Sequence, residues 1–195
     1  MAETETAARD DGDTAARART RRAIVAAAIE VLAGDGGASL SEVAAAAQVS
    51  RTTVHRYFAE RSDLIAAVAD EAIAQVTAAT RRACLDRGPA PKALARLCRE
   101  YFELGSVLTI LFNGVVDITE QDWARCETDS DRELAATVAR GREEGSIAPD
   151  LTDAWIVQLV WTLLYTAWTY VREQDVPRQE GLELCLRSLR KAVAA

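Results

Sequence analysis

Apolar residues recur at helical spacing near the N-terminus of the chain. Five of them fall on one face of a helix: Ile24, Ala27, Ala28, Val31 and Leu32. The run "GDGG" at 34–37 follows, and glycine is the residue that best tolerates the left-handed conformation at a helix end. The pattern predicts an amphipathic helix that ends at these glycines.

Two further short segments continue the helical pattern. Ser39 and Glu42 have the spacing of a capping box at the start of a second helix. The apolar stripe of that helix consists of Leu40, Val43, Ala44 and Ala47. Gln48, Val49 and Ser50 form a break, and Ser50 is a favourable N-cap for a third helix of about two turns beginning at Arg51. Three short helices with a three-residue turn before the last predict a helix-turn-helix.

The predicted third helix has one apolar and one polar face. At about 100° per residue, Tyr57 and Phe58 fall on the side of Val54. The opposite side has Thr52, Thr53, His55 and Arg56, with Arg51 in the first turn, and there is no acid between 51 and 59. Such donors and acceptors match base edges in a major groove, where an acid would meet phosphate repulsion. A solvated polar face is the structural alternative, but the capping box, the turn and the preceding arginines favour DNA binding.

The rest of the chain predicts longer helices and an all-α fold. A three-helix DNA-binding domain with the helix-turn-helix is expected at 17–62, and a larger helical domain at 63–195. Residues 1–16 are expected to be a disordered tail, since the first 13 contain no large apolar side chain after Met1. The helices expected after the first domain are 64–87, 91–112, 132–144, 153–173 and 179–193, with a short element at 117–126.

Charge is distributed unevenly over a chain whose net charge is −7. Residues 14–65 contain seven arginines and five acids, whereas residues 66–195 contain 15 basic and 20 acidic residues. Arg17, Arg19, Arg21 and Arg22 stand together with no acid among them. A basic end on an acidic body orients a protein on DNA and limits non-specific association.

Several chemistries have no support in the sequence. The four cysteines are far apart and form no CxxC pair, and His55 is the only histidine. A metal site, a cofactor and a catalytic dyad are therefore not expected, and no nucleophile elbow or phosphate loop suggests an enzyme. The first twenty residues are polar and unlike a signal peptide, so a cytoplasmic protein with reduced thiols is expected.

The segment 154–171 is uncharged and rich in aromatic residues. Its 18 residues are short for a membrane span and include Gln158 and three threonines, so a helix buried by protein is the preferred interpretation. Trp161, Leu164, Tyr165 and Trp168 form one stripe. An effector cavity needs aromatic walls with a few polar groups, and ordinary core or dimer packing is the alternative. The effector-binding candidates are Phe102, Phe112, Asn113, Trp123, Tyr165 and Trp168.

Residues 22–68 resemble the TetR family of bacterial transcriptional regulators. The matching features are Gly36, Ser39, Val49-Ser50, Tyr57-Phe58 and Arg61. The chain departs from the family pattern at three positions. Gln48 stands where glycine is usual, which predicts backbone strain, Thr52 stands where a small residue is common, and His55 stands where tyrosine is frequent.

The resemblance implies a role for each matched residue. Ser39 would bind phosphate, as would Arg56, Tyr57 and Arg61, whereas Arg51, Thr52, Thr53 and His55 would approach bases. Ser50 belongs to the same expected DNA surface as the N-cap of the reading helix.

The resemblance also implies how such a regulator is controlled. Residues 63–195 would be the C-terminal domain for effector binding and dimerisation. A homodimer through the last two helices would bind double-stranded DNA at a palindromic operator. The expected function is a repressor released by a small-molecule effector. The alternative is a regulator of the same fold that responds to a protein partner instead.

Overall fold

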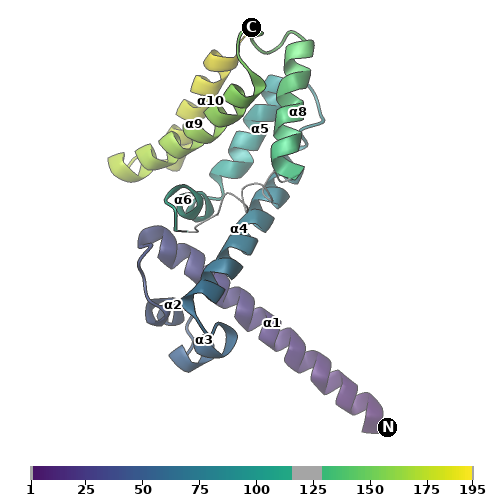
Figure 1. Cartoon of the computed structure of the whole chain (residues 1–195), viewed down its shortest axis with the longest axis vertical. Coiled ribbons are helices and arrows are strands. Elements are labelled where there is room, and N and C mark those ends of the chain that lie inside the picture. Colours follow the sequence, from purple (N-terminus) through teal and green to yellow (C-terminus); the bar gives the residue numbers. More distant parts are fainter. Residues whose placement is uncertain (1, 116–128, 195) are drawn as a thin grey trace. The chain divides into compact units, whose positions relative to one another are not determined.

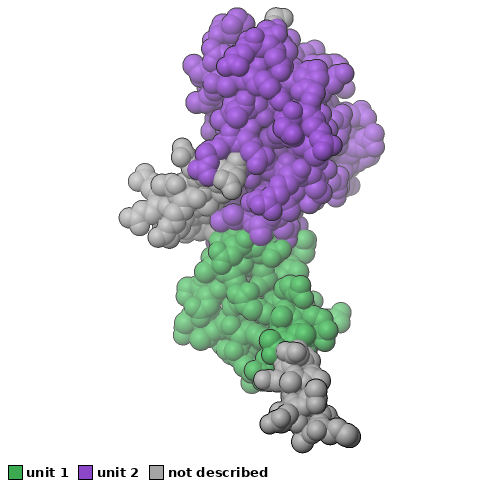
Figure 2. Space-filling model, turned by 90° about the vertical axis from the view of Figure 1, so that its right-hand side faces the viewer, with its two compact units in different colours: residues 1–71 green, residues 72–195 purple. Residues whose placement is uncertain are grey.

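The computed structural model describes residues 2–115 and 129–194, and the regular elements in these residues are all helices (Figure 1). This confirms the all-α class. The chain divides into two compact units, Met1–Glu71 and Ala72–Ala195 (Figure 2). The division falls inside helix α4, at a later position than the predicted boundary between 62 and 63. The helices are α1 (Ala2–Gly34), α2 (Leu40–Ala46), α3 (Arg51–Tyr57), α4 (Arg61–Ala83), α5 (Ala90–Phe102), α6 (Ser106–Phe112), α8 (Asp129–Glu143), α9 (Asp153–Gln174) and α10 (Arg178–Val193).

The first unit packs α1 against α2, and α2 against α3, around a small apolar core. Most of the residues predicted to line the inner faces are buried, and Val54 is fully covered. The buried apolar side chains larger than alanine are Ile24, Val25, Ile29, Leu32, Val43, Val54, Phe58, Leu64 and Val68. Burial of apolar area stabilises a fold by about 25 cal/mol per Å². This core therefore stabilises α2 and α3, which have seven residues each and are too short to be stable alone.

Helix α1 begins at Ala2 and includes the residues for which a disordered tail was expected. Six of residues 2–11 are alanine, glutamate or arginine, the other four are threonine or aspartate, and none is glycine or proline. Alanine, glutamate and arginine have high helix propensity, so an acidic segment without apolar side chains can still extend an existing helix. The helix ends at Gly34, as the glycine run predicts.

The second unit packs α5 against α8, α9 and α10, and α9 against α10. A single helix over 91–112 was expected, but the structure breaks it into α5 and α6. Gly105, at the break, has a φ of 32°, and a Cβ there would lie 2.7 Å from Cη2 of Trp168. The close approach of the Trp168 ring therefore requires glycine at this position, and a straight helix cannot follow that backbone. The expected element at 117–126 lies outside the described residues.

Helix α9 buries Ile156, Val160, Leu164 and Ala167 in its own chain, whereas Trp155 and Tyr165 are 60% and 42% exposed. The aromatic stripe predicted from spacing is thus only partly buried within one chain. None of the helices in the described ranges is long and apolar enough to cross a membrane.

Candidate DNA interface and effector cavity

Helix α3 presents a polar, basic surface opposite an apolar one. Arg51, Thr52, His55 and Arg56 are exposed, whereas Val54 is fully buried. Phe58, the C-cap, is 2% exposed, and its backbone N–H donates to the Val54 carbonyl. The polar face therefore faces solvent because the apolar face is fixed in the core.

The start of α3 is held by Ser50 and Thr53. The Ser50 Oγ accepts a hydrogen bond of 3.0 Å from the Thr53 N–H and lies 2.8 Å from Thr53 Oγ1. Both residues are among those expected on the DNA surface, but their hydroxyl groups already bond to each other. These hydrogen bonds cap the N-terminus of the helix that carries Arg51, Thr52 and His55.

The start of α2 has the predicted capping box. The Ser39 N–H donates to Glu42 Oε2 over 2.7 Å, the Ser39 hydroxyl donates to the same oxygen over 2.8 Å, and the Glu42 N–H donates back to Ser39 Oγ. These hydrogen bonds from the Ser39 backbone and hydroxyl lower the pKa of Glu42. Ser39 was expected to contact phosphate, and in this structure its hydroxyl is engaged by Glu42.

Arg61, the first residue of α4, is bonded within the first unit. Its guanidinium donates to the carbonyl oxygen of Ala38, and to that of Gly36 over 2.7 Å. Both acceptors belong to the loop between α1 and α2. The residue was expected to contact the DNA backbone, and its donors here hold the loop that precedes the capping box.

Two arginines stack on the aromatic pair that closes α3. The Arg21 guanidinium lies 5.2 Å from the centroid of the Phe58 ring, and that of Arg56 lies 5.4 Å from the centroid of Tyr57. Cation–π contacts of this length contribute about 0.5–1 kcal/mol at exposed sites. Arg21 thus joins α1 to the end of α3, a role that neither its spacing nor its charge predicted.

The five described effector candidates gather around α5, α6 and α9. Phe112 makes edge contacts with Tyr165 at 5.1 Å and with Trp161 at 6.1 Å between ring centroids. Phe102 contacts Trp168 at 5.6 Å, and Trp168 Nε1 donates to Thr109 Oγ1 over 2.7 Å. Trp123 lies outside the described residues.

A cavity of about 130 Å³ adjoins this aromatic group. Three of the candidates line it, together with one acid and one base; the lining is Thr109, Asn113, Tyr165, Trp168, Thr169, Arg172 and Glu173. Phe102 is 1% exposed and does not line the cavity, so its aromatic contact with Trp168 is a core contact. The structure thus brings the predicted residues together but divides them between the cavity and the core.

A larger hollow in the second unit was not anticipated from the sequence. It lies between α4 and α8, and its residues include Thr77, Arg81, Ser130 and Glu133. These polar side chains do not form an aromatic or metal-binding pattern, and only the tertiary fold of the second unit brings them together.

The geometry defines a class of protein: a helical regulator with a helix-turn-helix unit and a second helical unit that contains cavities. A family model described as bacterial regulatory proteins of the tetR family matches residues 24–68, which include α2 and α3. The HTH-type transcriptional repressor LfrR of Mycolicibacterium smegmatis is 30% identical over 181 residues, covering 93% of this chain and 94% of that protein. The chain belongs to the TetR family and is a DNA-binding transcriptional regulator, not an enzyme.

Two further similarities support this family. The HTH-type transcriptional regulator NfxB of Pseudomonas aeruginosa is 29% identical over 130 residues, covering 66% of this chain and 70% of that protein. The crystal structure of LfrR from Mycobacterium smegmatis in complex with proflavine aligns with a TM-score of 0.76 and 29% identity, covering 92% of this chain and 99% of that one. The similarity therefore extends over both units.

Proposed function

We propose that the protein is a cytoplasmic, homodimeric repressor that binds a palindromic operator and leaves it when a small molecule binds the second unit. One observation carries the DNA-binding part. Helix α3 exposes Arg51, Thr52, His55 and Arg56 on the side opposite Val54. A recognition helix needs such a face to read base edges in a major groove.

The role proposed for each residue of this surface depends on whether its side chain is already hydrogen-bonded within the first unit. Among the described residues the side chains of Arg51, Thr52 and His55 have no hydrogen-bond partner, and they would contact bases. Arg56 and Tyr57 would contact phosphates from the end of α3. Ser39, Ser50 and Thr53 would position the helices, since their hydroxyl groups are bonded within the unit. Arg61 would do the same for the loop before α2.

Selection from random duplexes would test DNA binding directly. The expected result is enrichment of a sequence with twofold symmetry, with half-sites about one helical turn or a multiple apart. Affinity for the selected duplex should fall steeply with added salt, because phosphate contacts release counterions. No preference for any duplex over bulk competitor would contradict the proposal.

The dimer would form through α9 and α10. Helix α9 leaves the Trp155 side chain 60% exposed. A second copy packed on α9 would cover it. Sedimentation of the wild type should give a dimer, and Trp155→Glu should shift it toward monomer. A monomeric wild type at micromolar concentration would contradict this part of the proposal.

The effector site would be the aromatic cavity, and a planar aromatic cation fits its chemistry. Tyr165 and Trp168 supply aromatic walls, and Glu173 supplies a carboxylate beside the cationic lining residue, Arg172. The related LfrR has been crystallised with proflavine. The cavity of about 130 Å³ is smaller than the 300–1,000 Å³ usual for such ligands. The half-exposed Tyr165 side chain must therefore move aside to admit the ligand.

Proflavine fluorescence would measure this binding. We expect Trp168→Ala and Glu173→Gln to weaken it by about tenfold each, whereas Glu183→Gln on α10 should leave it unchanged. A saturating ligand should also lower operator affinity, because helix α4 belongs to both units and would transmit a change between them. Unchanged operator affinity would contradict the switch but not the DNA binding.

The small cavity volume favours one alternative, in which a protein partner and not a small molecule controls the regulator. Thermal-shift screening separates the two, because a ligand that binds only the folded state raises the melting temperature. A screen of planar cations without any such rise would favour the protein partner.

A further inference from the structure

Two adjoining hollows form one polar cleft between α4 and α8. Their volumes are about 340 and 500 Å³, and both are lined by Arg81, Glu133 and Ala136. We call this the α4–α8 cleft. It shares no lining residue with the aromatic cavity.

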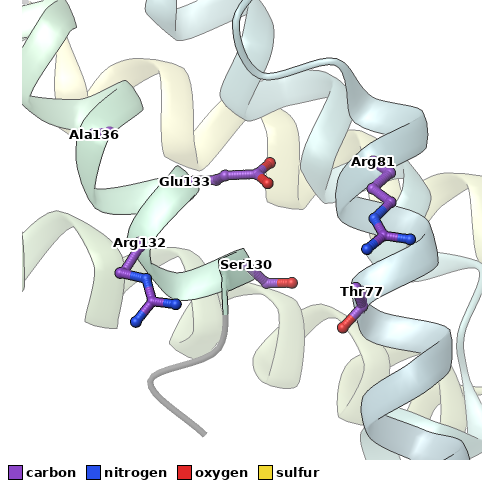
Figure 3. Close-up of a pocket in the computed structure, with 6 residues that line it drawn as sticks. All are labelled: Thr77, Arg81, Ser130, Arg132, Glu133 and Ala136. Carbon is purple, nitrogen blue, oxygen red and sulfur yellow. The ribbon is translucent and has the colours of Figure 1, made fainter.

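The polar side chains of the cleft converge from its two walls. In Figure 3, Ser130 and Glu133 project from α8 toward α4, where Thr77 and Arg81 lie opposite them. Arg132 also lines this hollow, but its guanidinium points away from the gap. One wall thus supplies a cation and a hydroxyl group, and the facing wall supplies an anion and a hydroxyl group.

Two of the charged groups that face each other across the cleft, those of Arg81 and Glu133, make no bond inside the part of the protein that the structure describes. Neither the Arg81 guanidinium nor the Glu133 carboxylate forms a hydrogen bond or an ion pair with another described residue. They therefore do not bond to each other, although they face one another across the cleft. Each offers a full set of hydrogen-bonding positions to a molecule placed between them.

Ser130 gives an independent indication of a ligand. The residue is 2% exposed, and its Oγ atom is buried without a hydrogen-bond partner. An unsatisfied buried hydroxyl is destabilising, so proteins seldom keep one without a reason. A bound molecule in the cleft would supply the missing partner.

The loop between α4 and α5 gives the cleft a fixed end. Arg96 donates to the carbonyl oxygens of Cys84 and Arg87 over 2.7 and 2.6 Å. Arg140 donates to the carbonyl oxygens of Leu85 and Asp86 over 2.8 and 3.0 Å. Cys84 to Arg87 also line the cleft, so this wall is held by two guanidinium groups and does not need a ligand to form.

We propose that the α4–α8 cleft binds a small zwitterion with its carboxylate on Arg81 and its ammonium group on Glu133. The guanidinium fork matches a carboxylate in a bidentate geometry, and Glu133 accepts from the ammonium group. Ser130 and Thr77 donate to the remaining carboxylate oxygen positions. The volume of the cleft suits a molecule of this class. This site is separate from the effector cavity of the proposed function and does not depend on it.

Linear ω-amino acids of increasing length test the proposal. Isothermal titration calorimetry of the full chain would compare 4-aminobutyrate, 5-aminovalerate and 6-aminohexanoate. Hexanoate and hexylamine, which each have one of the two charges, are the matched ligands. We expect at least one ω-amino acid to bind about tenfold more tightly than either singly charged compound.

Variants then locate the site. Arg81→Gln and Glu133→Gln should each weaken binding about tenfold, while Arg187→Gln and Glu143→Gln, exposed residues that do not line the cleft, should leave it unchanged. The exchanged pair Arg81→Glu with Glu133→Arg should restore binding with the ligand reversed. Ser130→Ala should weaken binding without lowering the melting temperature, which a purely structural serine would not do.

Three results would overturn the proposal. The first is that none of the three ω-amino acids binds. The second is that binding persists unchanged in Arg81→Gln. The third is that both glutamine variants lower the melting temperature alike with no effect on ligand, because this would identify an internal ion pair. None of these results bears on operator binding, so the proposed function is tested independently by the duplex selection.

Discussion

The DNA surface and the effector cavity are built from contacts of different range. In the first unit, the caps that start α2 and α3 join residues three positions apart, such as Ser50 with Thr53, and Arg61 reaches the Gly36 carbonyl across 25 positions. In the second unit, Trp168 bonds to Thr109 across 59 positions, and Arg178 donates to the Phe102 carbonyl across 76. The caps of the DNA-binding helices therefore depend mainly on neighbouring residues, whereas a cavity made by distant contacts changes whenever one of its helices shifts.

Because of this difference, stability and function depend on different residues in the first unit and on the same residues in the second. The exposed side of α3 makes few contacts in its own unit, so its residues can change with little loss of stability. The residues around the aromatic cavity pack against one another, so a change there alters the fold and the cavity together.

The largest expected effect is on DNA affinity. Arg51→Ala combined with Arg56→Ala should weaken operator binding about a hundredfold, because each arginine contributes roughly 1–3 kcal/mol to base or phosphate contacts. Fluorescence anisotropy with the selected duplex measures this loss. The melting temperature should stay within about 2 °C of the wild type, since both side chains are exposed.

Lys92→Ala combined with Arg99→Ala is the matched control, because both cations are exposed on α5 and the double variant removes the same charge. Its affinity for the duplex should equal that of the wild type. Should the control lose as much affinity as the α3 double variant, net charge and not the α3 surface would explain the binding.

The same difference in range explains what could be predicted from the sequence. The capping box at Ser39, the N-cap at Ser50 and the apolar side of α3 were predicted because each depends on residues within a few positions. The break at Gly105 was missed because it is caused by Trp168, which lies far along the chain.

The α4–α8 cleft shows the same limit. Thr77 and Arg81 lie one turn apart on one helix, as do Ser130 and Glu133 on another, and neither pair is unusual alone. Only the tertiary fold of the second unit brings the four around one hollow. No local pattern would have predicted them as a set.

A second prediction concerns the tight crossing of α9 and α10. A Cβ at Gly181 would lie 2.4 Å from Val171 Cγ2 and 3.0 Å from the Ala167 carbonyl oxygen. Gly181→Ala should lower the free energy of unfolding by about 1–3 kcal/mol, because the two helices must separate. Urea unfolding at a fixed protein concentration measures the change.

Gly34→Ala is the matched control in the first unit, because nothing lies within 4 Å of a Cβ at that position. It should be neutral or stabilising by up to about 1 kcal/mol, as alanine favours a helix. Equal destabilisation by both substitutions would mean that the α9–α10 crossing is not the cause.

A third prediction addresses the capping box. Ser39→Ala should lower the free energy of unfolding by about 1 kcal/mol, since it removes the acceptor for the Glu42 N–H. The pKa of Glu42 is lowered in the folded state, so its stabilising effect is present above the unfolded pKa and is lost as pH falls through the folded one. The melting temperatures of the wild type and Glu42→Gln should therefore converge on acidification, and a constant difference down to pH 2 would contradict the charged capping bond.

The smallest expected effect is at the turn itself, and it has the opposite sign. Gln48 has a φ of 55° and follows the C-cap of α2, where the Val49 N–H donates to the Ala44 carbonyl over 3.0 Å. This left-handed position is unfavourable for a residue with a Cβ by about 1–2 kcal/mol, and glycine loses part of that advantage through its unfolded-state entropy. Gln48→Gly should raise the free energy of unfolding by about 0.5–1 kcal/mol, whereas Gln48→Ala keeps the Cβ and should not. If both variants unfolded at the same urea concentration, the strain at this turn would be absent, and the bond from Val49 would hold the turn at no conformational cost.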